Sequence, residues 1–327
     1  MQHLWIRATC FIAAVASGVS LLAKVYGIVE MSVSVALVVL PCCIGLVVFW
    51  SWARRNRLEE VAAVVGIGIV GGLLSTLAYD LTRLPFHLSG YLVFATNSTY
   101  GMWITDAAAS SRNTEVVGWL YHFSNGVTFS VMYALFMRGR HWIWAVVYAF
   151  VLESIAVFSL FGQVFSLAGN YGMVSIAYLA HISYGLPIGV MVHRWEASRE
   201  WLAARQVPIA AMFTLFFASF LIPVLTPAKI VRDATVGPGV FTTDGIALVP
   251  FMQRIGKGGT VAVENRNQGE IVVRVVKTGD RHAIPAGESG KIAFPEAGIY
   301  QIHIETDGVS RSSFVIAEPV SEIPVGR

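Results

Sequence analysis

Residues 61–83 read VAAVVGIGIVGGLLSTLAYDLTR, an apolar run that carries charge only near its end, at Asp80 and Arg83. A helix needs about 20 consecutive apolar residues to cross the hydrocarbon core of a bilayer, and this run is long enough. Six other stretches have the same character, at 6–28, 32–53, 115–137, 142–165, 172–193 and 207–227. The sequence therefore predicts a membrane all-α bundle of seven transmembrane helices within residues 1–228.

The composition of the chain agrees with this class. Of its 327 residues, 55% are hydrophobic and only 13% are charged, whereas a soluble domain carries roughly 25% charged residues. Charge becomes ordinary in the C-terminal part, which indicates a soluble domain after the bundle. The net charge of +3 and the lack of basic runs mixed with aromatic residues argue against a nucleic-acid partner. The three cysteines form no C-x-x-C pair.

Basic residues set the expected orientation. With Arg7, alternate breaks between the apolar stretches hold nine Lys and Arg residues, whereas the opposite breaks hold only Lys24, Arg83 and Arg112. The positive-inside rule then places the N-terminus in the cytoplasm and the C-terminal domain outside, in the periplasm or extracellular space. We expect a multi-pass protein of a plasma membrane, the inner membrane in a bacterium. The first stretch could instead be a cleaved signal peptide, although its length favours a retained helix.

The longest loop joins the third and fourth stretches. It covers 84–114 and is rich in aromatic and amide side chains. Loops of this length are usually functional or carry short helices of their own.

The C-terminal domain has a different periodicity. Apolar and polar residues alternate in short runs at 260–265, 271–276, 291–294 and 313–317, and glycine-containing turns separate them. A domain of about ninety residues with strands at such intervals is typical of a β-sandwich. We expect this all-β sandwich at residues 236–320.

Parts of this domain resemble the cupredoxin family. The segments IPAGESGKIAF (284–294) and GIY (298–300) look like the second half of a cupredoxin domain, and VAVEN (261–265) resembles the strand before its first copper ligand. The resemblance implies a cupredoxin-like sandwich, but the family's first histidine would fall near Glu270 and its cysteine near Ile304. A blue-copper centre needs these ligands, so none is expected here. His303 adjoins the cysteine position, but strand alternation should point it to the opposite face.

Two histidines begin copies of one pattern within the membrane domain. His122 opens HFSNGVTFSVM (122–132) and His181 opens HISYGLPIGVM (181–191), with His, Ser, Gly, Val and Met at matching positions. An ionisable side chain inside a membrane is costly, so a repeated intramembrane histidine indicates a functional site. The two copies run in the same direction and predict a duplicated hairpin of helices.

Small residues follow each histidine at the fourth and eighth positions, as Gly126 and Ser130 and as Gly185 and Gly189. In membranes such stripes allow close helix approach. They would equally leave room for a flat cofactor beside the imidazole.

Two carboxylates accompany these histidines, Asp80 and Glu153. Two imidazoles with one or two carboxylates suit zinc, copper or iron, which makes His122, His181, Glu153 and Asp80 candidate metal ligands. The two imidazoles alone, His122 and His181, would suit a b-type haem. A chain of histidine and glutamate also suits proton movement. Against a shared site, the histidines could hydrogen-bond neighbouring helices, and Asp80 could pair with Arg83 one turn away.

Three functions remain open on this basis. The first is a metal- or haem-binding membrane protein, redox or metal-handling, whose site opens to the exterior. The second is a non-catalytic subunit or assembly factor, whose exterior domain docks other membrane subunits or periplasmic proteins. The third is a proton-coupled transporter of small solutes. No P-loop, dinucleotide fingerprint, H-E-x-x-H or G-x-S-x-G occurs, which counts against nucleotide-driven transport and common hydrolase chemistry. Catalytic residues and enzyme activity stay unassigned.

Overall fold

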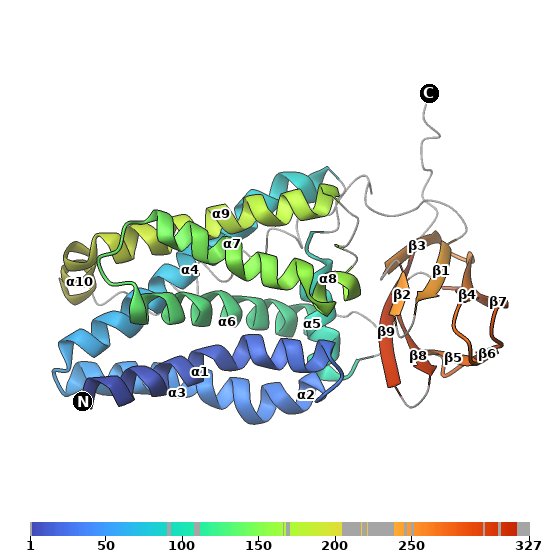
Figure 1. Cartoon of the computed structure of the whole chain (residues 1–327), viewed down its shortest axis with the longest axis horizontal. Coiled ribbons are helices and arrows are strands. Elements are labelled where there is room, and N and C mark those ends of the chain that lie inside the picture. Colours follow the sequence, from blue (N-terminus) through green and yellow to red (C-terminus); the bar gives the residue numbers. More distant parts are fainter. Residues whose placement is uncertain are drawn as a thin grey trace.

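The protein has a helical N-terminal part and a β-rich C-terminal part (Figure 1). The computed structural model describes residues 2–89, 93–107, 112–165, 167, 171–204, 217, 221, 239–244, 247–249, 252–296, 298–306 and 309–318. The helices are α1 (Gln2–Val25), α2 (Met31–Ser34), the π-helical turn η1 (Val35–Val39), α3 (Leu40–Arg55), α4 (Glu59–Leu88), α5 (Ala95–Thr105), α6 (Arg112–Phe136), α7 (Ile143–Phe158), α8 (Leu160–Val164), α9 (Tyr171–His193) and α10 (Trp195–Ala204).

Several helices are long and apolar enough to cross a membrane. Within the described residues there are four, at Trp5–Val25, Met31–Arg55, Glu59–Leu88 and Tyr171–His193, which indicates a membrane protein. Helix α6 is as long, with 25 residues, but polar side chains interrupt its apolar character. The predicted helix 142–165 ends instead at Phe158, because the backbone of Ser159 is extended. Most of the predicted span 207–227 lies outside the described residues.

Helix α4 is the centre of the bundle. It packs closely against both α6 and α9, whereas α6 and α9 contact each other at fewer residues. Its sequence explains this position, because small and β-branched residues lie on all faces of α4 and let neighbouring helices approach it from several sides. The segment predicted as a long loop at 84–114 is partly helical: α4 continues to Leu88, and the short helix α5 follows. Helix α5 packs on α6.

The C-terminal strands form two sheets around one apolar core. The strands are β1 (Gly239–Asp244), β2 (Ala247–Val249), β3 (Met252–Gly256), β4 (Thr260–Asn265), β5 (Ile271–Val275), β6 (Arg281–Ile284), β7 (Ser289–Ala293), β8 (Gly298–Thr306) and β9 (Val309–Glu318). Among the described residues one sheet has the order β2-β1-β4-β7 and the other β3-β9-β8-β5-β6. Both sheets contribute to a single core that includes Phe241, Val263 and Ile302.

The structure also shows where the residues at the expected copper-ligand positions lie. Ile304 is buried in the core, and Glu270 is exposed in the turn before β5. His303 lies on the opposite face from Ile304, across from Arg274 of β5, as alternation requires. Burial lowers the pKa of His303, so the neutral imidazole is favoured there.

Candidate functional site

The candidate residues are distributed over two helical hairpins in an equivalent way. Helices α4 and α6 pack together, as do α7 and α9. In each hairpin the first helix carries the carboxylate, Asp80 or Glu153, and the second carries the histidine, His122 or His181. Each carboxylate meets the histidine of its own hairpin, so the structure makes two carboxylate–histidine pairs from the four residues.

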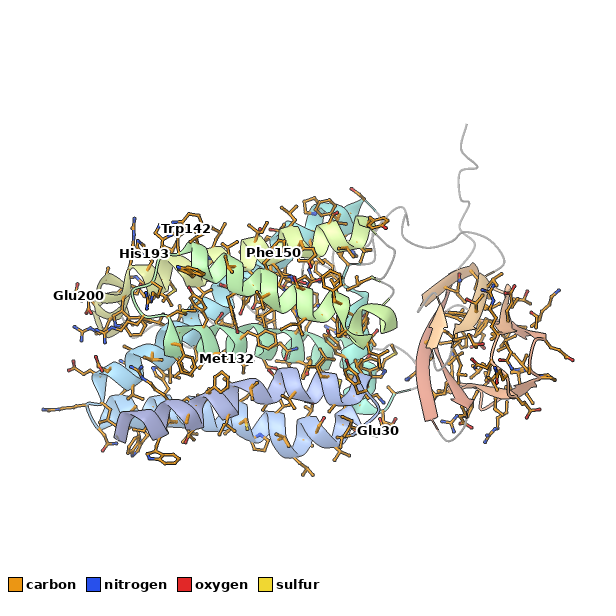
Figure 2. All side chains as sticks on the ribbon, in the orientation of Figure 1. Glu30, Met132, Trp142, Phe150, His193 and Glu200 are labelled. Atoms are coloured by element: carbon orange, nitrogen blue, oxygen red, sulfur yellow. The ribbon has the colours of Figure 1, made fainter. Side chains whose placement is uncertain are left out.

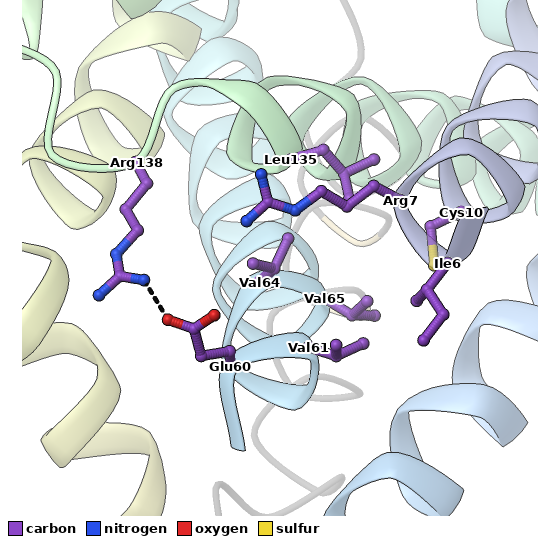
Figure 3. A pocket seen from close by; sticks show the side chains of 9 residues that line it. All are labelled: Ile6, Arg7, Cys10, Glu60, Val61, Val64, Val65, Leu135 and Arg138. Carbon is purple, nitrogen blue, oxygen red and sulfur yellow. Dashed lines mark hydrogen bonds and ion pairs between the residues drawn. The ribbon is translucent and has the colours of Figure 1, made fainter. Parts of the chain in front are cut away.

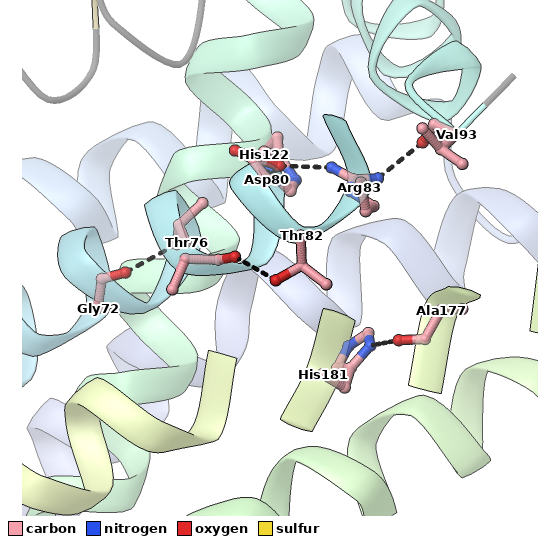
Figure 4. A network of polar contacts seen from close by, with 10 residues as sticks. Gly72, Thr76, Asp80, Thr82, Arg83, Val93, His122, Ala177 and His181 are labelled. Atoms are coloured by element: carbon pink, nitrogen blue, oxygen red, sulfur yellow. Dashed lines mark hydrogen bonds and ion pairs between the residues drawn. The ribbon is translucent and has the colours of Figure 1, made fainter. Parts of the chain in front are cut away.

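Asp80 is the centre of a buried charge network on α4 (Figure 4). Its Oδ1 lies 2.6 Å from Nη2 of Arg83 and 3.0 Å from Nε2 of His122. The side chains of Asp80 and Arg83 are only 4% and 6% exposed, so this ion pair is nearly removed from solvent. The pairing of Asp80 with Arg83 agrees with their spacing in the sequence, but the contact with His122 depends on how α4 and α6 are rotated.

Arg83 also attaches the network to the following loop. Its Nη1 donates a hydrogen bond of 2.7 Å to the carbonyl oxygen of Val93, and its guanidinium lies 4.6 Å from the ring centroid of Phe94. Phe94 in turn contacts Trp119 of α6, with ring centroids 5.3 Å apart. The buried Arg83 therefore holds Val93 and Phe94, the two residues directly before α5, next to the Asp80–His122 pair.

The second pair is simpler. Nδ1 of His181 lies 3.2 Å from Oε2 of Glu153 and 2.9 Å from the carbonyl oxygen of Ala177, one turn earlier on α9. Glu153 is 5% exposed. Within the described part of the chain, His181 is the one side chain that forms an ion pair or hydrogen bond with it. Within the described residues no arginine or lysine forms an ion pair with this carboxylate, whereas Asp80 is paired with Arg83.

Tyr79 lies between the two pairs. Its ring centroid is 5.8 Å from that of His122 and 4.9 Å from that of His181, and Arg83 lies over the ring at 4.2 Å. The sequence alone indicates an interface aromatic or a hydrogen-bond donor at this position. Its place next to Asp80 on the central helix is the one signal that would have pointed to a role in the site.

The small residues that follow the two histidines along α6 and α9 allow close packing of the helices. A Cβ atom added to Gly126 would lie 1.8 Å from Oγ1 of Thr76 on α4, and one added to Gly185 would lie 2.7 Å from the Cα of Val146 on α7. Ser130 is hydrogen-bonded to the hydroxyl of Tyr184, which also donates to the carbonyl oxygen of Gly126. Of the two roles considered for this stripe, close helix approach is the one observed, and the neighbouring helices fill the space beside it.

The four candidate ligands do not converge on one point. Among the described residues no group of three or more His, Cys, Asp or Glu side chains is arranged to hold a metal ion. The prediction of a metal site formed by His122, His181, Glu153 and Asp80 together is therefore not supported by this geometry. Tyr79 contacts both imidazoles, and binding of a haem by His122 and His181 stays a prediction.

Comparison with protein families, with curated proteins and with solved structures found no match for this chain. The cupredoxin resemblance of the C-terminal domain therefore has no support beyond its own residues. The protein thus combines helices that are long and apolar enough to cross a membrane with two buried carboxylate–histidine pairs.

Proposed function

We propose that this protein is a proton-coupled membrane transporter and that Glu153 and His181 are its proton-exchanging pair. The observation that carries the proposal is the asymmetry between the two hairpins. Asp80 has Arg83 three residues later, whereas Glu153 has Ala156 at the same spacing. A carboxylate buried without a fixed positive charge is costly, so it favours a protonated form or exchange with a neighbouring base.

The geometry around His181 suits such an exchange. Nδ1 can donate one proton, and both the carbonyl oxygen of Ala177 and Oε2 of Glu153 are placed to accept it. Nε2 is then the nitrogen that takes up a further proton, and the Glu153 carboxylate stabilises the resulting imidazolium. Tyr79 contacts the ring of His181 and also lies under the guanidinium of Arg83, so it links this position to the charged pair of the first hairpin.

Glu153→Gln is the variant that tests the proposal. Purified protein in liposomes, adsorbed to a sensor membrane, is exposed to a pH step while the displaced charge is recorded. The wild type is expected to give a transient current, and Glu153→Gln to reduce it by about tenfold or more, because general acid–base groups contribute on the order of 100-fold to proton-transfer rates. Glu59→Gln, at the exposed start of α4, is the matched control and should leave the current unchanged. Equal currents in Glu153→Gln and wild type would exclude Glu153 as the exchanging group.

Metal handling is the second candidate. Each histidine has a carboxylate near one ring nitrogen, an arrangement common among metal-ligating histidines, whose other nitrogen binds the ion. The observation that favours it is that the Nε2 atom of His181 has no hydrogen bond within the described residues.

Elemental analysis and an optical spectrum of the gently purified protein separate the two candidates. Under metal or haem binding, a stoichiometric metal or a Soret band is expected in the wild type and is lost when His122 and His181 are both replaced by alanine. Under proton transport, the wild type is colourless and metal-free, yet responds to the pH step. A metal that persists in the double variant would place the metal site elsewhere.

The finer topology is part of the proposal. We propose seven spans, a cytoplasmic N-terminus and an exterior cupredoxin-like sandwich that docks partner proteins. The distribution of Lys and Arg supports the orientation. The two sheets around one core, with the quoted segments in β4, β7 and β8, support the sandwich. If the protein is instead a subunit of a larger complex, it should co-purify with partners and give no current by itself.

A further inference from the structure

Two histidines lie together at the end of the bundle that carries α10. His141 belongs to the loop between α6 and α7, and His193 is the last residue of α9. Their ring centroids are 5.2 Å apart, and both residues are exposed. Figure 2 shows His193 at this end of the bundle, away from the C-terminal strands. Because His181 lies more than three turns earlier on α9, this position is about 18 Å along the helix from the pair of His181 with Glu153.

The loop between α6 and α7 is fixed on the end of α9 by two backbone contacts. The N–H of Gly139 donates a hydrogen bond of 3.0 Å to the carbonyl oxygen of Val192, and the φ angle of Gly139 is +68°, a value that favours glycine. A Cβ atom added to Gly189 would lie 2.6 Å from the carbonyl oxygen of Trp142, so the loop lies directly on the helix there. The two contacts flank His141 in the sequence and hold its backbone beside the end of α9.

The basic residues near the two histidines are either paired or exposed to solvent. Arg138 forms ion pairs with Glu60 of α4 (Figure 3) and with Glu196 of α10. Arg140 and Arg194, which adjoin the histidines in the sequence, are exposed, so water weakens their repulsion of a bound cation. The ion pairs of Arg138 also attach the loop to two further helices.

Most of the ring nitrogens have no protein partner. Within the described residues the two imidazoles accept one hydrogen bond, from the N–H of Ile143 to Nδ1 of His141, and at 3.4 Å it is long. No third His, Cys, Asp or Glu side chain in the described part of the chain joins them in a larger ligand group. The other three ring nitrogens are therefore available to a ligand from solvent.

We propose that His141 and His193 together bind one divalent transition-metal ion of the copper and zinc class, with water in the remaining coordination positions. Imidazole nitrogens suit both ions, and Cu²⁺ binds such ligands more tightly than Zn²⁺. An ion about 2.1 Å from one nitrogen of each ring, with a tetrahedral angle between the two bonds, sets the ring centroids about 5 Å apart. The observed separation of 5.2 Å agrees with this distance, so binding requires the exposed rings to rotate but not the backbone to move. Two protein ligands hold the ion weakly, so the protein loses it during purification unless metal is added.

Titration of the full-length protein with Cu²⁺, followed by electron paramagnetic resonance, tests the site. The protein is purified in detergent without a polyhistidine tag, and all samples carry His3→Ala, which removes a further histidine at the start of α1. One Cu²⁺ per chain is expected, with hyperfine splitting from two imidazole nitrogens. In His141→Ala and in His193→Ala the apparent Kd should rise by about tenfold or more, because loss of a mere hydrogen-bond partner of a ligating histidine already costs about 10- to 100-fold in metal affinity.

His122→Ala/His181→Ala is the matched control and should leave the Kd for Cu²⁺ unchanged, which separates this site from any metal bound within the membrane domain. Both His141 and His193 are exposed, so their substitution should not affect folding. The proposal is overturned if only one of the two single substitutions weakens binding, or if neither does, since the ion is then not shared between the two rings. Loss of the Cu²⁺ signal in the control variant would likewise overturn it. The site does not depend on proton exchange, so the absence of a transient current leaves it standing.

Discussion

Asp80→Ala is expected to destabilise the membrane domain by about 3–5 kcal/mol, because it leaves the Arg83 guanidinium buried without its counter-charge. Arg83 is 5% exposed, and within the described residues its remaining polar and ring contacts are the carbonyl oxygen of Val93 and the rings of Tyr79 and Phe94. None of these supplies a negative charge. A thermal unfolding curve in detergent, followed by intrinsic tryptophan fluorescence, measures the effect.

The double variant Asp80→Ala/Arg83→Met is the control for this charge effect. Removing both charges should recover a large part of the lost stability, since a buried ion pair is often replaced by apolar residues at little cost. Glu153→Gln is the second comparison and should change stability far less, because no arginine or lysine among the described residues is paired with Glu153. If Asp80→Ala and the double variant were equally unstable, packing around Asp80 and not its charge would be the cause.

Gly118→Ala should have the second large effect on stability. A Cβ atom at Gly118 would lie 1.9 Å from the carbonyl oxygen of Asn97, and Gly101 of α5 faces it with an equally close approach to Thr114. Both neighbours are backbone atoms, so α5 must move away from α6. We expect the free energy of unfolding to fall by about 3 kcal/mol, at the upper end of the usual cost of overpacking. The contacts of Arg83 with Val93 and Phe94, which directly precede α5, should also weaken.

Gly45→Ala is the matched control for Gly118→Ala. Gly45 also lies in an apolar helix, α3, but nothing lies within 4 Å of an added Cβ atom. Alanine should therefore be neutral there or stabilising by up to about 1 kcal/mol through its higher helix propensity. The difference between the two melting temperatures isolates the close contact between α5 and α6. Equal behaviour of the two variants would mean that α5 adjusts without cost.

Parts of the candidate site were visible in the sequence because they break a strong pattern. Asp80, His122, Glu153 and His181 stand out because ionisable side chains are rare in apolar helices. The pairing of Asp80 with Arg83 also followed from spacing along one helix. The close contact of Gly101 with Gly118, and the position of Tyr79, carried no comparable signal, since glycine and tyrosine are common in membrane helices.

The sequence by itself determined the class of this protein, because the length and polarity of its segments are local properties. Apolar stretches of about 20 residues predict membrane helices, and a period of two predicts strands with buried alternate residues. Only the tertiary structure decided which carboxylate meets which histidine. Those contacts depend on the rotation and contact of α4, α6, α7 and α9, which are set by side-chain packing across the helices. The same packing brings neighbouring helices against the small residues beside the histidines, so close helix approach is their observed role.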